Sequence, residues 1–189
     1  MTSVPLRIGT LGSDALLTGP FDARARLAAA IEAADIDHLF VADHISFHDG
    51  TGMDGLVDTA VLTTLCPRLE VCVGVYLLAL RHPVAVARQL ASLARSAPGR
   101  IVLGVGVGGE DRHEIEICGV DPKRRGDRTD HSLSALEGLL SGAPSSYSCD
   151  HFSWQDAIIK PRPAERIPIL IGGRADAALR RAGRFGDGW

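Results

Sequence analysis

The sequence lacks the spacings of metal and disulfide chemistry. Its four cysteines, Cys66, Cys72, Cys118 and Cys149, include no CxxC pair, which argues against a zinc site and a disulfide framework. Such cysteines are usually buried free thiols in a reducing compartment. The seven histidines do not pair with carboxylates at ligand spacing, and no HExxH, GxSxG or Walker sequence occurs. We therefore expect no metal ion.

The chain also lacks a strong charge of either sign and a long apolar segment. Its 20 Lys and Arg residues and 23 Asp and Glu residues give a net charge of −3, so we expect no nucleic-acid partner. No basic N-terminal region precedes a long apolar run, and the apolar stretches are too short to span a bilayer. With 189 residues, 46% of them hydrophobic, the sequence predicts one cytoplasmic domain over 1–189 without a membrane partner.

Short apolar runs alternate with helical patterns along the chain. Continuously apolar runs are typical of strands that are covered on both faces, as in parallel sheets. The predicted strands are Leu6–Thr10, His38–Ala42, Leu69–Leu78, Arg100–Val105 and Ile167–Ile171. The predicted helices begin at about Asp22 (as N-cap) and at Pro83, and span Asp54–Leu65, Thr129–Leu140 and Ala175–Phe185. This order predicts an α/β fold, either a doubly wound sheet or a (β/α) barrel, with 141–166 as a small insertion between the fourth and fifth units.

A glycine-rich stretch follows the fourth predicted strand. Gly104, Gly106 and Gly109 match GxGxxG, the fingerprint of a dinucleotide-binding turn. That fingerprint belongs in the first unit, however, and no strand ending in an acidic residue follows about 20 residues later. Three interpretations stay open from the residues alone: a dinucleotide turn, a ligand-binding loop at the carboxyl end of a barrel strand, and a turn without a ligand.

Three stretches resemble the luciferase-like monooxygenase family, in the branch that uses the deazaflavin coenzyme F420. They are VADHI at 41–45, the segment from RHP at 81–83 through APGRIVLGVGVGG at 97–109, and IPILIGGRADAALRRAGRFGDGW at 167–189. The resemblance implies a TIM-type (β/α)8 barrel of the bacterial luciferase-like type, of which this chain carries about the first five to six β/α units. Family members continue past GDGW, so we expect an incomplete barrel with two open sheet edges.

The resemblance implies an oxidoreductase that transfers a hydride between coenzyme F420 and a small organic substrate. FMN is the alternative cofactor, with oxygen-dependent monooxygenation as the reaction. A non-catalytic truncated barrel that binds a flavin or a partner is the second alternative. His44 would be the catalytic proton partner, because an imidazole can give or take a proton near neutral pH. His48 would face the substrate, and we expect a homodimer.

The resemblance also implies a set of cofactor-binding residues at the ends of the predicted strands. These are Asp43, Tyr76, Leu77, Val107, Gly108, Gly109, Gly172, Gly173 and Arg174. The third strand would contain a bulge with a non-proline cis peptide at Tyr76–Leu77, and the loop at 172–174 would contact a phosphate at the start of a helix. Sugar-phosphate dehydrogenases of the family carry a glutamate where this chain has Gly109, which argues against sugar-phosphate oxidation.

Overall fold

A five-stranded parallel sheet forms the centre of the protein. We analysed a computed structural model, which describes residues 6–12 and 14–189. The strands, in spatial order, are β1 (Gly9–Leu11), β2 (His38–Val41), β5 (Glu70–Leu77), β6 (Ile101–Gly106) and β9 (Ile169–Ile171). Each strand therefore pairs with the sheet strand that precedes it in the chain, and every pairing is parallel.

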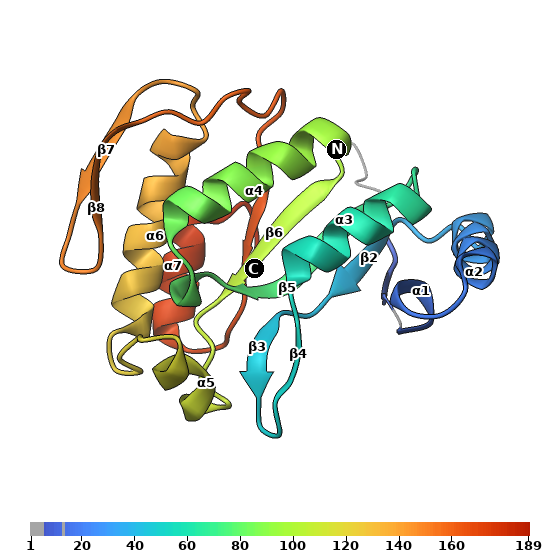
Figure 1. Cartoon of the computed structure of the whole chain (residues 1–189), viewed down its shortest axis with the longest axis horizontal. Helices are drawn as coiled ribbons and strands as arrows, with labels where there is room; N and C mark the ends of the chain where they lie inside the picture. Colours follow the sequence, from blue (N-terminus) through green and yellow to red (C-terminus); the bar gives the residue numbers. More distant parts are fainter. Residues whose placement is uncertain (1–5, 13) are drawn as a thin grey trace.

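This strand order decides between the two predicted architectures. A doubly wound sheet reverses its strand order at a switch point, whereas each new strand here is added beside the last. Right-handed crossovers then place the connecting helices on one face, and α3 (Gly55–Leu65) and α4 (Pro83–Ser96) lie across that face (Figure 1). The sheet is a segment of a singly wound barrel. The doubly wound alternative is wrong, and β6 offers no switch point for a dinucleotide turn.

The barrel segment is open at both edges within the described residues. β1 is the first strand and β9 the last, and a single parallel bridge between Leu170 and Gly188 begins the pairing beyond β9. Its core is well filled, since β6 is buried at every position and Leu90 and Ala91 of α4 are each 1% exposed. Full burial of a leucine side chain such as that of Leu90 contributes about 1.5–3 kcal/mol to the free energy of folding.

The remaining helices are α1 (Asp14–Leu17), α2 (Phe21–Ala33), η1 (Leu78–Leu80), α5 (Arg112–Ile117), α6 (Arg125–Leu139) and α7 (Asp176–Phe185). Asp54 caps α3 by accepting hydrogen bonds from the N–H groups of Leu56 and Val57. The predicted cap of α2 is wrong. Pro20 occupies the capping position, and Asp22 lies in the first turn, where its charge favours the helix dipole. In the described part of the chain, no helix has the length and apolarity that a membrane span requires.

Two antiparallel hairpins interrupt the β/α alternation. The first joins β3 (His44–Phe47) to β4 (Thr51–Met53), and the second joins β7 (Ser145–Ser148) to β8 (Ser153–Ala157). The second hairpin falls within the 141–166 segment. Figure 1 shows the first hairpin beside α5 at one end of the sheet. That end is formed by the carboxyl ends of the parallel strands.

Candidate active-site cleft

A cleft of about 330 Å³ lies at the carboxyl ends of β2, β5, β6 and β9. Parallel barrels place their active sites at this end. The predicted site residues that line the cleft are Asp43, His44, Leu77, Val107, Gly108, Gly109, Gly172 and Gly173. A hollow of about 390 Å³ between α6 and α7 contains none of the predicted site residues, so the cleft is the candidate site.

The floor of the cleft is bare backbone around one valine. A Cβ atom at Gly106 would lie 2.4 Å from Cγ2 of Val75, and one at Gly172 would lie 2.6 Å from Cγ1 of the same side chain. Both positions therefore exclude any larger residue while Val75 keeps its place. Gly108 and Gly173 have φ values of +67° and +115°, which glycine adopts without steric cost. The floor is therefore close-packed main chain with the side chain of Val75 against it, and no side chain projects from Gly106 or Gly172.

His44 lies at the start of β3 and is held by a buried carboxylate. Its Nδ1 atom is 3.3 Å from Oε1 and 3.2 Å from Oε2 of Glu114, whose side chain is 3% exposed. The main-chain N–H groups of Ile45 and Ser46 donate to the same Oε1 at 2.6 and 3.2 Å. The ring of Phe47 lies beside the imidazole, with 4.2 Å between ring centroids. His44 is thus fixed in orientation while remaining part of the cleft lining.

Glu114 is a site residue that the sequence analysis missed. Asp111 and Glu114 form the D-x-x-E spacing of a capping box at the start of α5. Asp111 caps the helix by accepting from the N–H of His113 at 2.9 Å, but Glu114 bonds to the β3–β4 hairpin. The spacing in the sequence could therefore have indicated a short helix, but not the partners of its glutamate.

Asp43 also lines the cleft, but its oxygens are fully occupied. They accept from both terminal nitrogens of Arg81, at 2.5 and 2.7 Å, and from the N–H groups of Gly55 and Leu77, at 3.0 and 2.8 Å. The N–H bonds from Leu77 and Gly55 join the end of β2 to β5 and α3, and the bidentate ion pair adds Arg81, which follows η1. It also gives the arginine of the RHP segment a structural role, while His82 of that segment caps α4 through Val84.

Three predicted site residues lie outside the cleft lining. Tyr76 is fully buried, and its ring lies under the guanidinium of Arg81, 4.4 Å away. The non-proline cis peptide is at Gly74–Val75, so its predicted position at Tyr76–Leu77 is wrong. The irregular register of β5 falls between Val73 and Tyr76, and bare Gly74 fits closely against the ring of Phe40 there.

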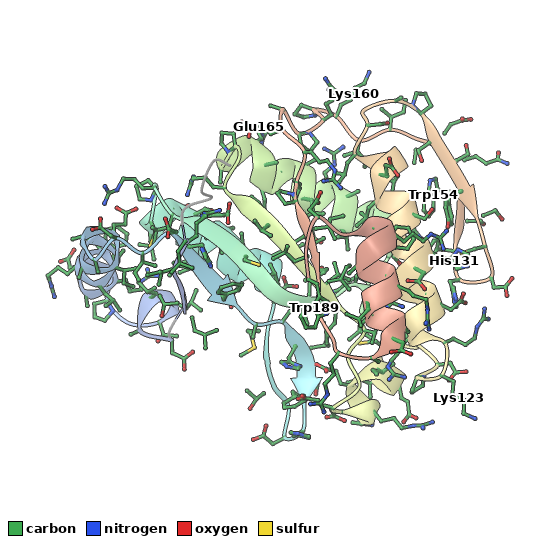
Figure 2. All side chains as sticks on the ribbon, turned by 180° about the vertical axis from the view of Figure 1, so that it is seen from behind. Lys123, His131, Trp154, Lys160, Glu165 and Trp189 are labelled. Atoms are coloured by element: carbon green, nitrogen blue, oxygen red, sulfur yellow. The ribbon has the colours of Figure 1, made fainter. Side chains whose placement is uncertain are left out.

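His48 and Arg174 are the other two residues outside the lining. His48 lies at the hairpin tip with its side chain 65% exposed, and its N–H donates to Asp111 at 2.7 Å. This hydrogen bond lowers the pKa of the Asp111 carboxyl. Arg174 is exposed beside Gly173, whose carbonyl accepts a hydrogen bond from the indole N–H of Trp189 at 2.6 Å. Trp189 is labelled near β9 and α7 in Figure 2.

The cysteines lie away from this chemistry. Cys66 and Cys72 are buried free thiols, and burial raises the pKa of each to about 11, which makes them poor nucleophiles at neutral pH. Among the described residues, no cluster of three or more His, Cys, Asp and Glu side chains could hold a metal ion. The groups available for chemistry in the cleft are therefore an imidazole, carboxylates and main-chain amides.

The fold and the cleft define a β/α-barrel protein. Its glycine loops and a histidine bound by a carboxylate meet at the carboxyl ends of the strands. The chain belongs to the luciferase-like monooxygenase family, whose family model matches residues 4–189.

Two curated proteins are similar to this chain in sequence, and a solved structure is similar to it in fold. An uncharacterised protein of Mycobacterium tuberculosis (strain ATCC 25618 / H37Rv) is 35% identical over 182 residues, covering 86% of this chain and 62% of the relative. An F420-dependent glucose-6-phosphate dehydrogenase of Nakamurella multipartita is 33% identical over 195 residues, covering 100% of this chain and 57% of the relative. The structure of an F420-dependent secondary alcohol dehydrogenase with an F420–acetone adduct aligns with a TM-score of 0.79 at 23% identity, over 96% of this chain and 56% of that one. The chain thus spans little more than half the length of these proteins.

Proposed function

We propose that this chain carries the cofactor site and the proton-transferring group of an oxidoreductase that uses coenzyme F420 and a small organic substrate. One observation carries the proposal: His44, oriented by buried Glu114, lines the same cleft as the glycine floor of β6 and β9. The name of the relative from Nakamurella multipartita supports F420 as the cofactor. When bound, the deazaflavin would accept or supply a hydride.

The residues of the cleft fit such a cofactor. A flat ring needs a surface without long side chains, and Gly106 and Gly172 contribute no side chain to the cleft, while the short side chain of Val75 packs against both. The loop at Gly172 and Gly173 leads into α7, a helix of 10 residues, whose N-terminus favours a nearby anionic group. Gly108 and the loop at Gly173 would hold the tail, and Arg174 would add positive charge.

His44 would handle the proton that accompanies hydride transfer. Oxidation of an alcohol releases a hydroxyl proton, and reduction of a carbonyl requires one. A positioned imidazole in this role contributes about 10²–10⁴-fold to the rate. Its Nδ1 is bound by Glu114, so Nε2 is the nitrogen that would face the substrate. Phe47 covers one side of the ring and would restrict water there.

The substrate that we propose is an alcohol or carbonyl compound without a sugar phosphate. Gly109 stands where sugar-phosphate dehydrogenases of the family carry a glutamate, and its φ of +129° strains any other residue. A Cβ there would also lie 3.0 Å from a guanidinium nitrogen of Arg125. The protein is proposed to act as a cytoplasmic homodimer, and light scattering at several concentrations tests the dimer.

The first experiment is a fluorescence titration of the purified protein with F420 and, in parallel, with FMN. Saturable binding of F420 alone supports the proposal, whereas saturable binding of FMN alone overturns it in favour of a monooxygenase. Binding of neither overturns the cofactor site in this chain. The variant His44→Ala should retain F420 binding and lose about 10²–10⁴-fold of turnover. Unchanged turnover would remove His44 from the chemistry.

A further inference from the structure

A single buried carboxylate fixes the orientation of the candidate proton-transferring group. Glu114 is 2% exposed and belongs to α5, 70 residues away in sequence from His44. Its Oε1 accepts from two main-chain N–H groups, of Ile45 and Ser46, and both of its oxygens lie within hydrogen-bond distance of His44 Nδ1. The β3–β4 hairpin and the imidazole therefore depend on the same side chain.

The chemistry of this contact determines which ring nitrogen carries hydrogen. A carboxylate can only accept hydrogen bonds, so Nδ1 must be the donor when it faces Glu114. A neutral imidazole has one N–H, and Nε2 is then left with a free lone pair. Among the described residues, no hydrogen-bond partner contacts Nε2, and 29% of the His44 side chain is exposed on the cleft side.

We propose that Glu114 is a positioning residue that holds neutral His44 in the Nδ1–H tautomer and so presents Nε2 to the substrate as the proton acceptor. The catalytic meaning of this assignment rests on the proposed function, but the tautomer itself does not. The same carboxylate ties the imidazole to the hairpin, so that the ring and the residues that follow it keep one geometry.

The test exploits a difference between Glu and Gln at this position. In Glu114→Gln, the single amide oxygen of the glutamine still accepts hydrogen bonds from the N–H groups of Ile45 and Ser46. The amide nitrogen then takes the place of Oε2, 3.2 Å from Nδ1, and donates to it. The amide oxygen at the Oε1 position also lies 3.3 Å from Nδ1, but its two lone pairs already accept from the N–H groups of Ile45 and Ser46. We therefore expect Nδ1 to accept from the amide nitrogen and the ring hydrogen to move to Nε2. The substitution should therefore switch the tautomer rather than merely weaken a contact.

The measurement is ¹⁵N NMR of the histidine side chains in the protein without cofactor, at about pH 9, where an ordinary imidazole is neutral. The His44 signals are assigned with His44→Ala. We expect Nδ1–H in the parent protein and in Glu114→Asp if the shorter acid still reaches the ring, and Nε2–H in Glu114→Gln. The matched control is Glu110→Gln, an exposed cleft residue that makes no hydrogen bond to His44 in the structure, and it should leave the Nδ1–H tautomer unchanged.

Two results overturn the assignment: an Nε2–H tautomer in the parent protein, or the same tautomer in the parent and in a folded Glu114→Gln variant. Amide spectra establish that each variant is folded, and Glu114→Ala replaces Glu114→Gln if the latter is not. With F420 bound, Glu114→Gln should lower kcat about 10–100-fold, by analogy with groups that orient ligating histidines, with little change in cofactor affinity. If the His44 tautomer is the same in Glu114→Gln as in the parent protein, the positioning role is overturned. Absence of F420 binding overturns only the proposed function.

Discussion

Two buried carboxylates at the same end of the sheet, those of Asp43 and Glu114, have different kinds of hydrogen-bond partner. Asp43 accepts four hydrogen bonds, two of them from the permanently charged guanidinium of Arg81. Glu114 accepts two from main-chain N–H groups, and its third partner is the imidazole of His44. The partner of Asp43 is thus an arginine, which cannot release its proton. The partner of Glu114 is a histidine, which can release a proton and which borders the cleft.

The difference separates Asp43, whose partners hold the fold together, from Glu114, which we propose positions His44. Asp43 gains a fixed geometry but no reactivity, because its four hydrogen bonds, from Arg81, Gly55 and Leu77, leave its oxygens no free position. Glu114 leaves one nitrogen of its partner unbonded, and an unbonded, oriented nitrogen is what proton transfer requires. Burial alone therefore does not distinguish the two acids, and the chemistry of the partner does.

Substitution of Asp43 should have the largest effect on stability. Asp43→Asn removes the nearer of the two carboxylates that balance partly buried Arg81, leaving Asp54 at 3.4 Å, and should lower the free energy of unfolding by up to about 3–5 kcal/mol. Urea unfolding followed by circular dichroism measures this loss. The double variant Asp43→Asn with Arg81→Met should recover part of it, because the partly buried guanidinium is then gone and the charge left without a partner, on Asp54, is 37% exposed to solvent. A double variant no more stable than Asp43→Asn would contradict the ion-pair explanation.

Substitution of Glu114 should cost less stability. Glu114→Ala leaves the part-buried N–H groups of Ile45 and Ser46 without their acceptor. A fully buried unsatisfied donor costs about 1–3 kcal/mol, and these groups should cost less because Ile45 is 41% exposed and water can reach them. The same unfolding experiment should therefore rank Glu114→Ala below Asp43→Asn. If the order is reversed, the comparison between Asp43 and Glu114 is wrong.

An exposed carboxylate provides the lower limit of the series. Asp127 of α6 is 2.8 Å from Nε2 of His151, but its side chain is 51% exposed. His151 lies in the turn of the β7–β8 hairpin. Figure 2 labels His131, on the same helix as Asp127, and Trp154 of β8 beside this hairpin. Because solvent screens the pair, Asp127→Asn should change the free energy of unfolding by less than about 1 kcal/mol at neutral pH.

The pH dependence of Asp127 has a definite sign. The hydrogen bond from His151 lowers the pKa of Asp127 from its ordinary value of 3.8. A carboxyl with a lowered pKa in the folded protein contributes stability above that ordinary value and loses it as the pH falls through the folded value. The parent protein and Asp127→Asn should therefore converge in stability as the pH falls below 3.8 and through the lowered pKa. Divergence at acidic pH would show that another group dominates.

The strands that the sequence predicts best are those covered on both faces. The expected runs at His38–Ala42, Leu69–Leu78 and Arg100–Val105 match β2, β5 and β6 to within one residue at each end, since continuous apolar character is their main determinant. The first strand is shorter than expected. It begins at Gly9, where pairing with β2 starts, and Leu6 is 88% exposed.

The elements that escape prediction depend on distant partners. The β3–β4 hairpin lacks a regular alternation, and acids of the α5 region hold it through main-chain N–H groups. The glycine loops after β6 and β9 could be predicted, because glycine has no side chain and its positions can be identified directly from the sequence. The role of Asp43 could not, since it depends on Arg81, 38 residues later in the chain.

The sequential strand order has a consequence for how the chain is made. Because each sheet strand pairs with the one before it, every newly synthesised unit finds its partner already present on the ribosome. The pairings of β1, β2, β5 and β6 join neighbouring units and keep contacts local, which favours fast folding. The pairing of β6 waits longest, because β9 begins only at Ile169, after α5, α6 and the β7–β8 hairpin. The growing end of the sheet is then the only new edge at each stage of synthesis, and it is covered as soon as the next unit emerges.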